Sequence, residues 1–318
     1  MRKKRYIISL IFTILMVFVA EFTNELEIIF PEILALLSGA WIADTQPWKV
    51  SKKQLFLLIS LSSFVGVIIV KYICVHTLIK IAIAFTFSFL ILTLSKTTII
   101  PLISACILPI LLNTSTWIYP ISVTIMCALI VIIQYFMEIL CIRHKENNTV
   151  ILSDSVATLE LEDNKIKNII IKYFKSLTII LFVALFPVIT NNLFFIAPPL
   201  IVTFMEFSDI NSPARKNAKK IVVLIGITAL VGSMGKLFLN VYLQLPLYLV
   251  CTIVTICVFI IFEKNNIIFP LAAAISLLPL LLNENSLYIY PIEVFIGSCI
   301  FITLALLIFK ENEKVYDM

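Results

Sequence analysis

Apolar runs separated by short polar stretches follow one another along the whole chain. A helix that crosses a bilayer needs about 20 apolar residues, and most of these runs approach that length. The apolar segments are 6–21, 27–43, 54–71, 74–94, 98–112, 117–140, 173–190, 194–208, 220–239, 243–262, 266–282 and 288–309. The pattern therefore predicts an all-α, polytopic transmembrane bundle of about twelve helices.

Four of these segments differ from the rest, because they are short for a full span and carry prolines. They are 27–43, 98–112, 194–208 and 266–282. Since proline removes a backbone donor and interrupts a helix, we expect these four to be tilted, kinked or broken.

The composition agrees with a bilayer as the solvent. Of 318 residues, 61% are hydrophobic and only 14% are charged, whereas a soluble domain carries about 25% charged residues. The net charge of +5 comes from basic residues in short loops, which is typical of membrane topology and gives no reason to expect nucleic acid as a partner. The seven cysteines and two histidines lack metal-ligand spacing, so neither a metal nor another cofactor is expected.

Lys and Arg concentrate in the cytoplasmic loops of membrane proteins. If the N-terminus is cytoplasmic and every segment spans, the basic clusters at 2–5, 49–53, 143–167 and 215–220 all fall on the cytoplasmic side. If the second and eighth segments were re-entrant instead, the basic loops after them would lie outside. The charge bias therefore favours full spans in the cell membrane, with both termini cytoplasmic.

The two halves of the chain resemble each other. Pro31 recurs as Pro198, displaced by 167 positions, and the stretch 101–121 matches 270–292. An even number of spans in each copy makes the copies parallel, related by a pseudo-two-fold axis along the membrane normal. The predicted organisation is a first membrane repeat at 1–142, a cytoplasmic linker at 143–167 and a second membrane repeat at 168–318.

Carboxylates inside or beside apolar segments are costly in a bilayer and suggest a function. Glu32 follows a proline early in the second segment, and Glu206 and Asp209 lie at the end of the eighth. We expect these three residues to act as coupling groups or as a gate. The alternatives are that Glu32 reaches water at the outer surface, and that Glu206 pairs at the interface with Arg215 or Lys216.

Lys80 is the basic residue whose position is hardest to explain, about two turns into segment 74–94 when counted from Val75. If it faces a polar path, its ammonium would contact an anionic substrate. The alternative is that its long stem carries the charge back to the outer interface.

Pro101 with Asn113, and Pro270 with Asn283, bracket two segments at matching positions of the repeats. Broken helices at matching positions near the bilayer midplane are the best sequence indication of a transport site. We therefore predict that these four residues belong to the substrate-binding elements, and that carbonyls freed by proline find partners in protein or water. The alternative is a duplicated packing geometry without a site, since small residues in both segments allow close helix approach.

The stretch Phe195–Gly235 resembles the first signature region of HPP-family membrane proteins. It has an apolar segment after Ala-Pro, a basic Ser-Pro-Ala-Arg-Lys loop, and a small-residue helix with Gly226, Gly232 and Gly235. The place of the second signature, a His-Pro-Pro-Ala-Gly box, is taken by Phe269–Ala273, which keeps one proline and one alanine. The resemblance implies a divergent, duplicated relative that transports small inorganic anions such as nitrite. A fainter likeness to fusaric-acid-resistance and aromatic-acid exporters implies efflux of organic acids.

Together these features predict a secondary transporter or permease of a small, anionic solute, with its pathway between the two repeats. The sequence has no Ser/His/Asp set, no acid pair beside a histidine and no phosphate-cradling loop, so an enzyme is not expected. An alternative of another class is a membrane-embedded interaction or assembly protein in which the prolines serve packing only. The expected partners are the lipid bilayer and the solute, and a homo-oligomer is left open.

Overall fold

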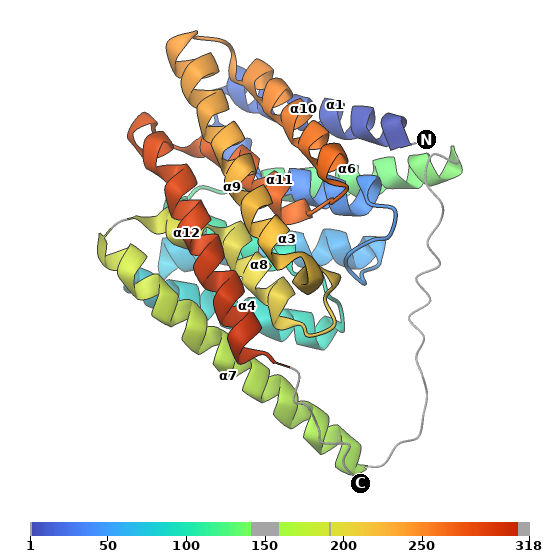
Figure 1. Cartoon of the computed structure of the whole chain (residues 1–318), viewed down its shortest axis with the longest axis vertical. Helices are drawn as coiled ribbons and strands as arrows, with labels where there is room; N and C mark the ends of the chain where they lie inside the picture. The colour runs from blue at the N-terminus through green and yellow to red at the C-terminus, as the bar shows by residue number, and fades with distance from the viewer. Residues whose placement is uncertain (1, 141–158, 191, 311–318) are drawn as a thin grey trace.

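The computed structural model describes residues 2–140, 159–190 and 192–310. Within these ranges the chain folds into a bundle of helices joined by short connections (Figure 1). Most of the linker predicted at 143–167 lies outside the described residues.

Eight helices of the described chain are long and apolar enough to cross a membrane. They are α1 (Arg2–Thr23), α3 (Lys52–Tyr72), α4 (Thr77–Ser95), α6 (Ile118–Ile139), α7 (Leu159–Thr190), α9 (Ala218–Met234) with its continuation η5 (Gly235–Tyr242), α10 (Leu247–Asn265) and α12 (Glu284–Ile308). Their outward faces carry large exposed apolar side chains such as Ile11, Phe22 and Phe182. The protein is therefore a multi-pass helical membrane bundle, which confirms the prediction from the apolar pattern.

The other four predicted segments form short helices. They are α2 (Glu32–Leu37) with η2 (Ser38–Ile42), α5 (Pro101–Leu112), α8 (Pro198–Ser208) and α11 (Pro270–Leu277) with η6 (Leu278–Leu281). The 12 residues of α5 extend about 18 Å at 1.5 Å per residue, well below the ~30 Å of a hydrocarbon core. Of the twelve predicted spans, eight thus reach the required length, while proline begins or interrupts each of the other four.

These short helices contact one another inside the bundle. α2 packs against α11, and α5 packs against α8. Every residue of α2 and of α11 is buried, and so is nearly every residue of α5 and α8. A helix that is apolar on all sides is stable only in the interior, so the long helices enclose the short ones.

Long helices also cross between the two halves of the chain. α1 packs against α10, and α4 packs against α7. Within each half, the third helix packs on the fifth and sixth, since α3 contacts α5 and α6, and α9 contacts α11 and α12. The centre of the bundle is therefore built from both halves.

Two glycines set how closely the long helices approach the short ones. A Cβ atom on Gly66 of α3 would lie 2.4 Å from the carbonyl oxygen of Cys106 in α5. A Cβ atom on Gly232 of α9 would lie 2.2 Å from the carbonyl oxygen of Ser276 in α11. Because both obstacles are backbone atoms of a packed helix, only glycine fits at either contact.

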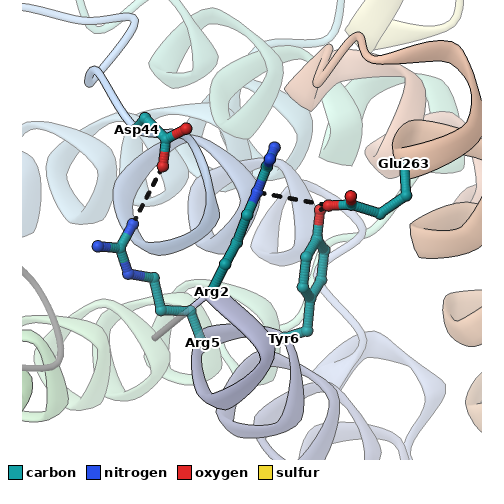
Figure 2. Close-up of polar contacts among 5 residues, drawn as sticks. All are labelled: Arg2, Arg5, Tyr6, Asp44 and Glu263. Atoms are coloured by element: carbon teal, nitrogen blue, oxygen red, sulfur yellow. Dashed lines mark hydrogen bonds and ion pairs between the residues drawn. The ribbon is translucent and has the colours of Figure 1, made fainter.

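One end of the bundle, which we call the basic end, is where α1 begins and α10 ends (Figure 2). Arg2 Nε lies 3.4 Å from Glu263 Oε1, and the Tyr6 hydroxyl donates to the same carboxylate. Arg5 Nη1 lies 3.5 Å from Asp44 Oδ1, in the loop after η2. Partly exposed ion pairs contribute little to the free energy of folding. These two pairs mark the contacts of α1 with α10 and with this loop.

The other end, which we call the far end, is where α1 ends and α10 begins. Glu21 near the end of α1 accepts backbone hydrogen bonds from Leu247 and Tyr248 at 2.9 and 3.1 Å. The carboxylate thereby satisfies two N–H groups that the first turn of α10 leaves without helical partners.

Candidate functional site

A cavity of about 390 Å³ opens at the far end, and both halves of the chain line it. The first half contributes η1 (Leu26–Ile28), the end of α5 and the start of α6, and the second contributes η3 (Leu193–Ile196), η6 and the start of α12. Its polar lining is Glu27, Thr114, Tyr119, Asn283 and Ser286. Asn283 was predicted from the sequence as a site residue, and it does line this far-end cavity.

A second cavity, of about 270 Å³, lies at the basic end. Pro47 and Trp48 of the first half line it, together with residues of the second half that include Glu206, Asn217 and Pro270. The structure thus brings together Glu206 and Pro270, two residues predicted separately from the sequence. Their shared cavity is small and partly polar, and the loop that carries Trp48 is the one held by the Arg5–Asp44 pair.

The segment formed by α11 and η6 runs from one cavity to the other. Pro270 at its start lines the basic-end cavity, and Leu281 at its finish lines the far-end cavity. Between these points every residue of α11 is buried, most closely against α2 and α9. The two cavities are therefore separated by closely packed helices.

Glu32 lies in this packed centre. Its side chain is 0% exposed, and the Ser104 hydroxyl of α5 donates to Oε1. Oε2 has no hydrogen-bond partner among the described residues. The sequence-based alternative, in which Glu32 reaches outer water, is not what the structure shows, because α2 starts inside the bundle.

Two tyrosines satisfy the carbonyls that proline leaves without donors. Pro109 cannot donate to the carbonyl of Ala105 four residues earlier, and the Tyr119 hydroxyl donates to that oxygen at 3.0 Å. The same arrangement recurs in the second half, where Pro279 follows Ile275 by four residues and the Tyr290 hydroxyl donates to the Ile275 oxygen at 2.7 Å. Protein groups thus supply the partners expected for these broken segments.

Lys236 has a similar role at the end of η6. Its side chain is only 9% exposed, and its ammonium donates to the carbonyl of Leu280 at 3.1 Å and to that of Leu282. Because η6 is not followed by another turn of helix, these carbonyls lack helical donors. The sequence marks Lys236 only as a basic residue near a helix end, and nothing in its position indicates these partners.

The carboxylates at the end of α8 have partners different from those considered for the sequence. The Ser212 hydroxyl donates to Glu206 Oε1 at 2.9 Å, and Asp209 accepts the backbone N–H of Asn211 at 3.1 Å. The alternative pairing of Glu206 with Arg215 or Lys216 is not found among the ion pairs of the described residues, and the Arg215 guanidinium donates instead to the backbone carbonyls of Phe207 and Phe309. Lys172 of α7 is instead the cation within electrostatic reach of both carboxylates.

Five predicted site residues line neither cavity: Glu32, described above, and the four that follow. Lys80 is half-buried in the first turn of α4, because the helix begins only at Thr77. Pro101 is buried as the first residue of α5, and Asn113 is exposed in left-handed conformation (φ 53°) just past its end. Asp209 is likewise exposed and outside the basic-end cavity.

Sequence reasoning missed Glu293 of α12. Its side chain is 3% exposed, it accepts a hydrogen bond from the backbone of Phe194, and Oε2 has no partner among the described residues. An acid within a long apolar run was the available signal.

Comparisons with protein-family models, with curated proteins and with solved structures find no match. The resemblances to HPP-family proteins and to aromatic-acid exporters therefore stay predictions.

Proposed function

We propose that the protein is a secondary transporter or permease that moves a small solute between the far-end cavity and the basic-end cavity. One observation carries this proposal: two cavities at opposite ends of the bundle are each lined by both halves and are joined by one buried, broken segment, α11 with η6. Transporters commonly place discontinuous helices at the interface of repeated halves.

The proposed motion is a displacement of the short helices relative to the long ones. The order long, short, long, long, short, long in each half supports two parallel repeats related by a pseudo-two-fold axis. The reciprocal packing of α2 on α11 and of α5 on α8 supports the same symmetry. Rocking of one half against the other would close one cavity as it opens the next, with Glu206 and Asp209 acting as a gate at the basic end.

The charge of the solute has two candidates. The sequence favours an anion, with Lys80 as a contact in a more open arrangement of α4. The cavity linings favour a neutral or cationic solute, because each contains one carboxylate, Glu27 or Glu206, and none of the described lining residues is Lys or Arg. Positive groups usually line pathways for anions.

The test is solute uptake by purified protein in liposomes, with a panel of small anions, amines and neutral polar compounds under imposed gradients. Ser286→Trp fills the far-end cavity and should abolish the uptake that the wild type shows. Tyr288→Trp is the matched control, since Tyr288 lies two residues further along α12, is 52% exposed and lines neither cavity. Absence of uptake for every compound, or equal loss in both variants, would refute the proposal.

A further inference from the structure

The centre of the bundle holds an acid with no cation beside it in the part of the chain that the structure describes. Glu32 is fully buried, with one hydrogen bond from Ser104 and one oxygen without a partner among the described residues. Burying an isolated, charged carboxylate in such an interior costs free energy, and this cost falls when the carboxylate binds a proton or a cation. Because no group of three or more acidic, cysteine or histidine side chains gathers anywhere in the described chain, a metal ion would find too few ligands.

The elements packed around Glu32 offer no other charge to balance it. α11 has no titratable residue in its sequence, and α5 has only the Cys106 thiol. The acid of α1, Glu21, is occupied by backbone N–H groups at the far end, and the basic residues of α1 lie at its other end. The nearby hydroxyls of Tyr119 and Tyr290 already donate to backbone carbonyls.

The far-end cavity comes close to this acid. Leu108 lines the cavity and lies four residues after Ser104 in α5, which is about 6 Å along the helix. Tyr119 also lines the cavity, and its hydroxyl bonds the carbonyl of Ala105, the neighbour of Ser104. Tyr119 thus borders the cavity and also lies within electrostatic reach of Glu32, so a displacement of this side chain would open a route from the cavity toward the Glu32–Ser104 pair.

We propose that Glu32 is a proton-binding site, loaded from the far-end cavity, that couples transport to a pH gradient. The step breaks and forms only O–H bonds: a proton leaves water in the cavity for the Glu32 carboxylate, and returns to water at the other side after the short helices move. Ser104 donates to the carboxyl group in both states. This inference rests on the proposed transport function for its coupling, but proton binding by Glu32 can be tested without any solute.

The first experiment is infrared difference spectroscopy of the full-length protein in lipid, recorded across a pH change. The expected result is a protonated-carboxyl C=O band that disappears at high pH and is missing in Glu32→Gln. Glu293→Gln is the matched control, because Glu293 is also buried with a free oxygen but is held to the backbone of Phe194; its spectrum should keep the band. A band that survives in Glu32→Gln, or responds to sodium and not to pH, would overturn the proposal.

A second variant covers the case in which Glu32→Gln does not fold, as judged by size-exclusion chromatography. Ser104→Ala keeps the acid and removes its hydrogen-bond donor, so the same band should move to higher frequency. An unchanged band would show that it belongs to another carboxyl group and would contradict the assignment.

Coupling is then measured with a pH-sensitive dye inside the liposomes. Solute-driven proton movement should fall at least tenfold in Glu32→Gln and stay near wild type in Glu293→Gln. Proton binding without any solute uptake would refute the transporter and leave the site standing. Solute uptake that ignores both pH and Glu32→Gln would refute the coupling and leave the transporter standing.

Discussion

Tyr119 and Tyr290 occupy the places where a proline would otherwise leave a buried carbonyl without a donor. Water cannot reach such a carbonyl in the packed centre, so a side chain must satisfy it. Each tyrosine precedes another proline in the sequence, Pro120 or Pro291, and lies near the start of a long helix, from which its hydroxyl reaches the preceding short helix.

Replacing either tyrosine with phenylalanine removes one hydroxyl and keeps the ring. We expect Tyr119→Phe and Tyr290→Phe each to lose about 0.5–2 kcal/mol of unfolding free energy, because a buried carbonyl is left unpaired. The measurement is unfolding in mixed detergent micelles. Tyr288→Phe serves as the control, since its hydroxyl only meets that of Tyr242 on an exposed face; an equal loss there would contradict the explanation.

The site residues that could be predicted are those with a local signal, a helix break or, for Glu206, a charge beside an apolar run. Pro270 and Asn283 were predicted from helix breaks, and both line cavities. The burial of Glu32 could not be predicted, because it depends on α11, more than 200 positions away in the sequence. Lys80 looked anomalous because an apolar run does not reveal that its helix begins at Thr77.

Among the elements, the short helices are the ones that apolar runs describe poorly. Segments 98–112 and 266–282 are apolar throughout, yet regular helix covers only Pro101–Leu112 and Pro270–Leu277 of them. Hydropathy measures how well residues tolerate an apolar environment, and a buried half-length helix satisfies it as well as a full span does. The sequence therefore marked these segments as short and interrupted, but the residues at which regular helix begins and ends within them were not predictable.

Gly66→Ala and Gly232→Ala test how tightly α3 and α9 hold the short helices. Each added Cβ would meet a backbone carbonyl of α5 or α11, so we expect a loss of about 1–3 kcal/mol or more from overpacking. Gly226→Ala is the matched control, because its Cβ meets only the ring of Phe295, which is 43% exposed and can turn aside. Melting curves that rank Gly226→Ala as the most damaging would contradict this account of the packing.

At the scale of the whole molecule, the two halves depend on each other. α1 and α2 find partners in α10 and α11, and α4 and α5 find partners in α7 and α8. A half on its own would leave the Glu32 carboxyl and the short-helix ends facing lipid, which is costly. Matching residues 167 positions apart indicated two copies in the sequence. Such matches show which segments correspond, but they do not show which helices of one copy pack against the other.

Cutting the chain between residues 150 and 151, in the predicted linker, tests this dependence. We expect fragments 1–150 and 151–318 to co-purify as a complex when produced together, and each to be degraded when produced alone. Affinity capture of one tagged fragment, followed by detection of the other, is the measurement. Stable, monodisperse single fragments would mean that the halves are independent units.

The pairing of Glu21 with Leu247 has a consequence for how the protein is made. The two residues are 226 positions apart, so at a synthesis rate of about 5–20 residues per second the first helix waits roughly 10–45 s for its partner. During that time its packing partners are limited to η1, α2 and η2, which follow it directly in the chain. The bundle can therefore close only when the last quarter of the chain leaves the ribosome, and a messenger truncated before α10 would release a protein whose first helix never finds its neighbour.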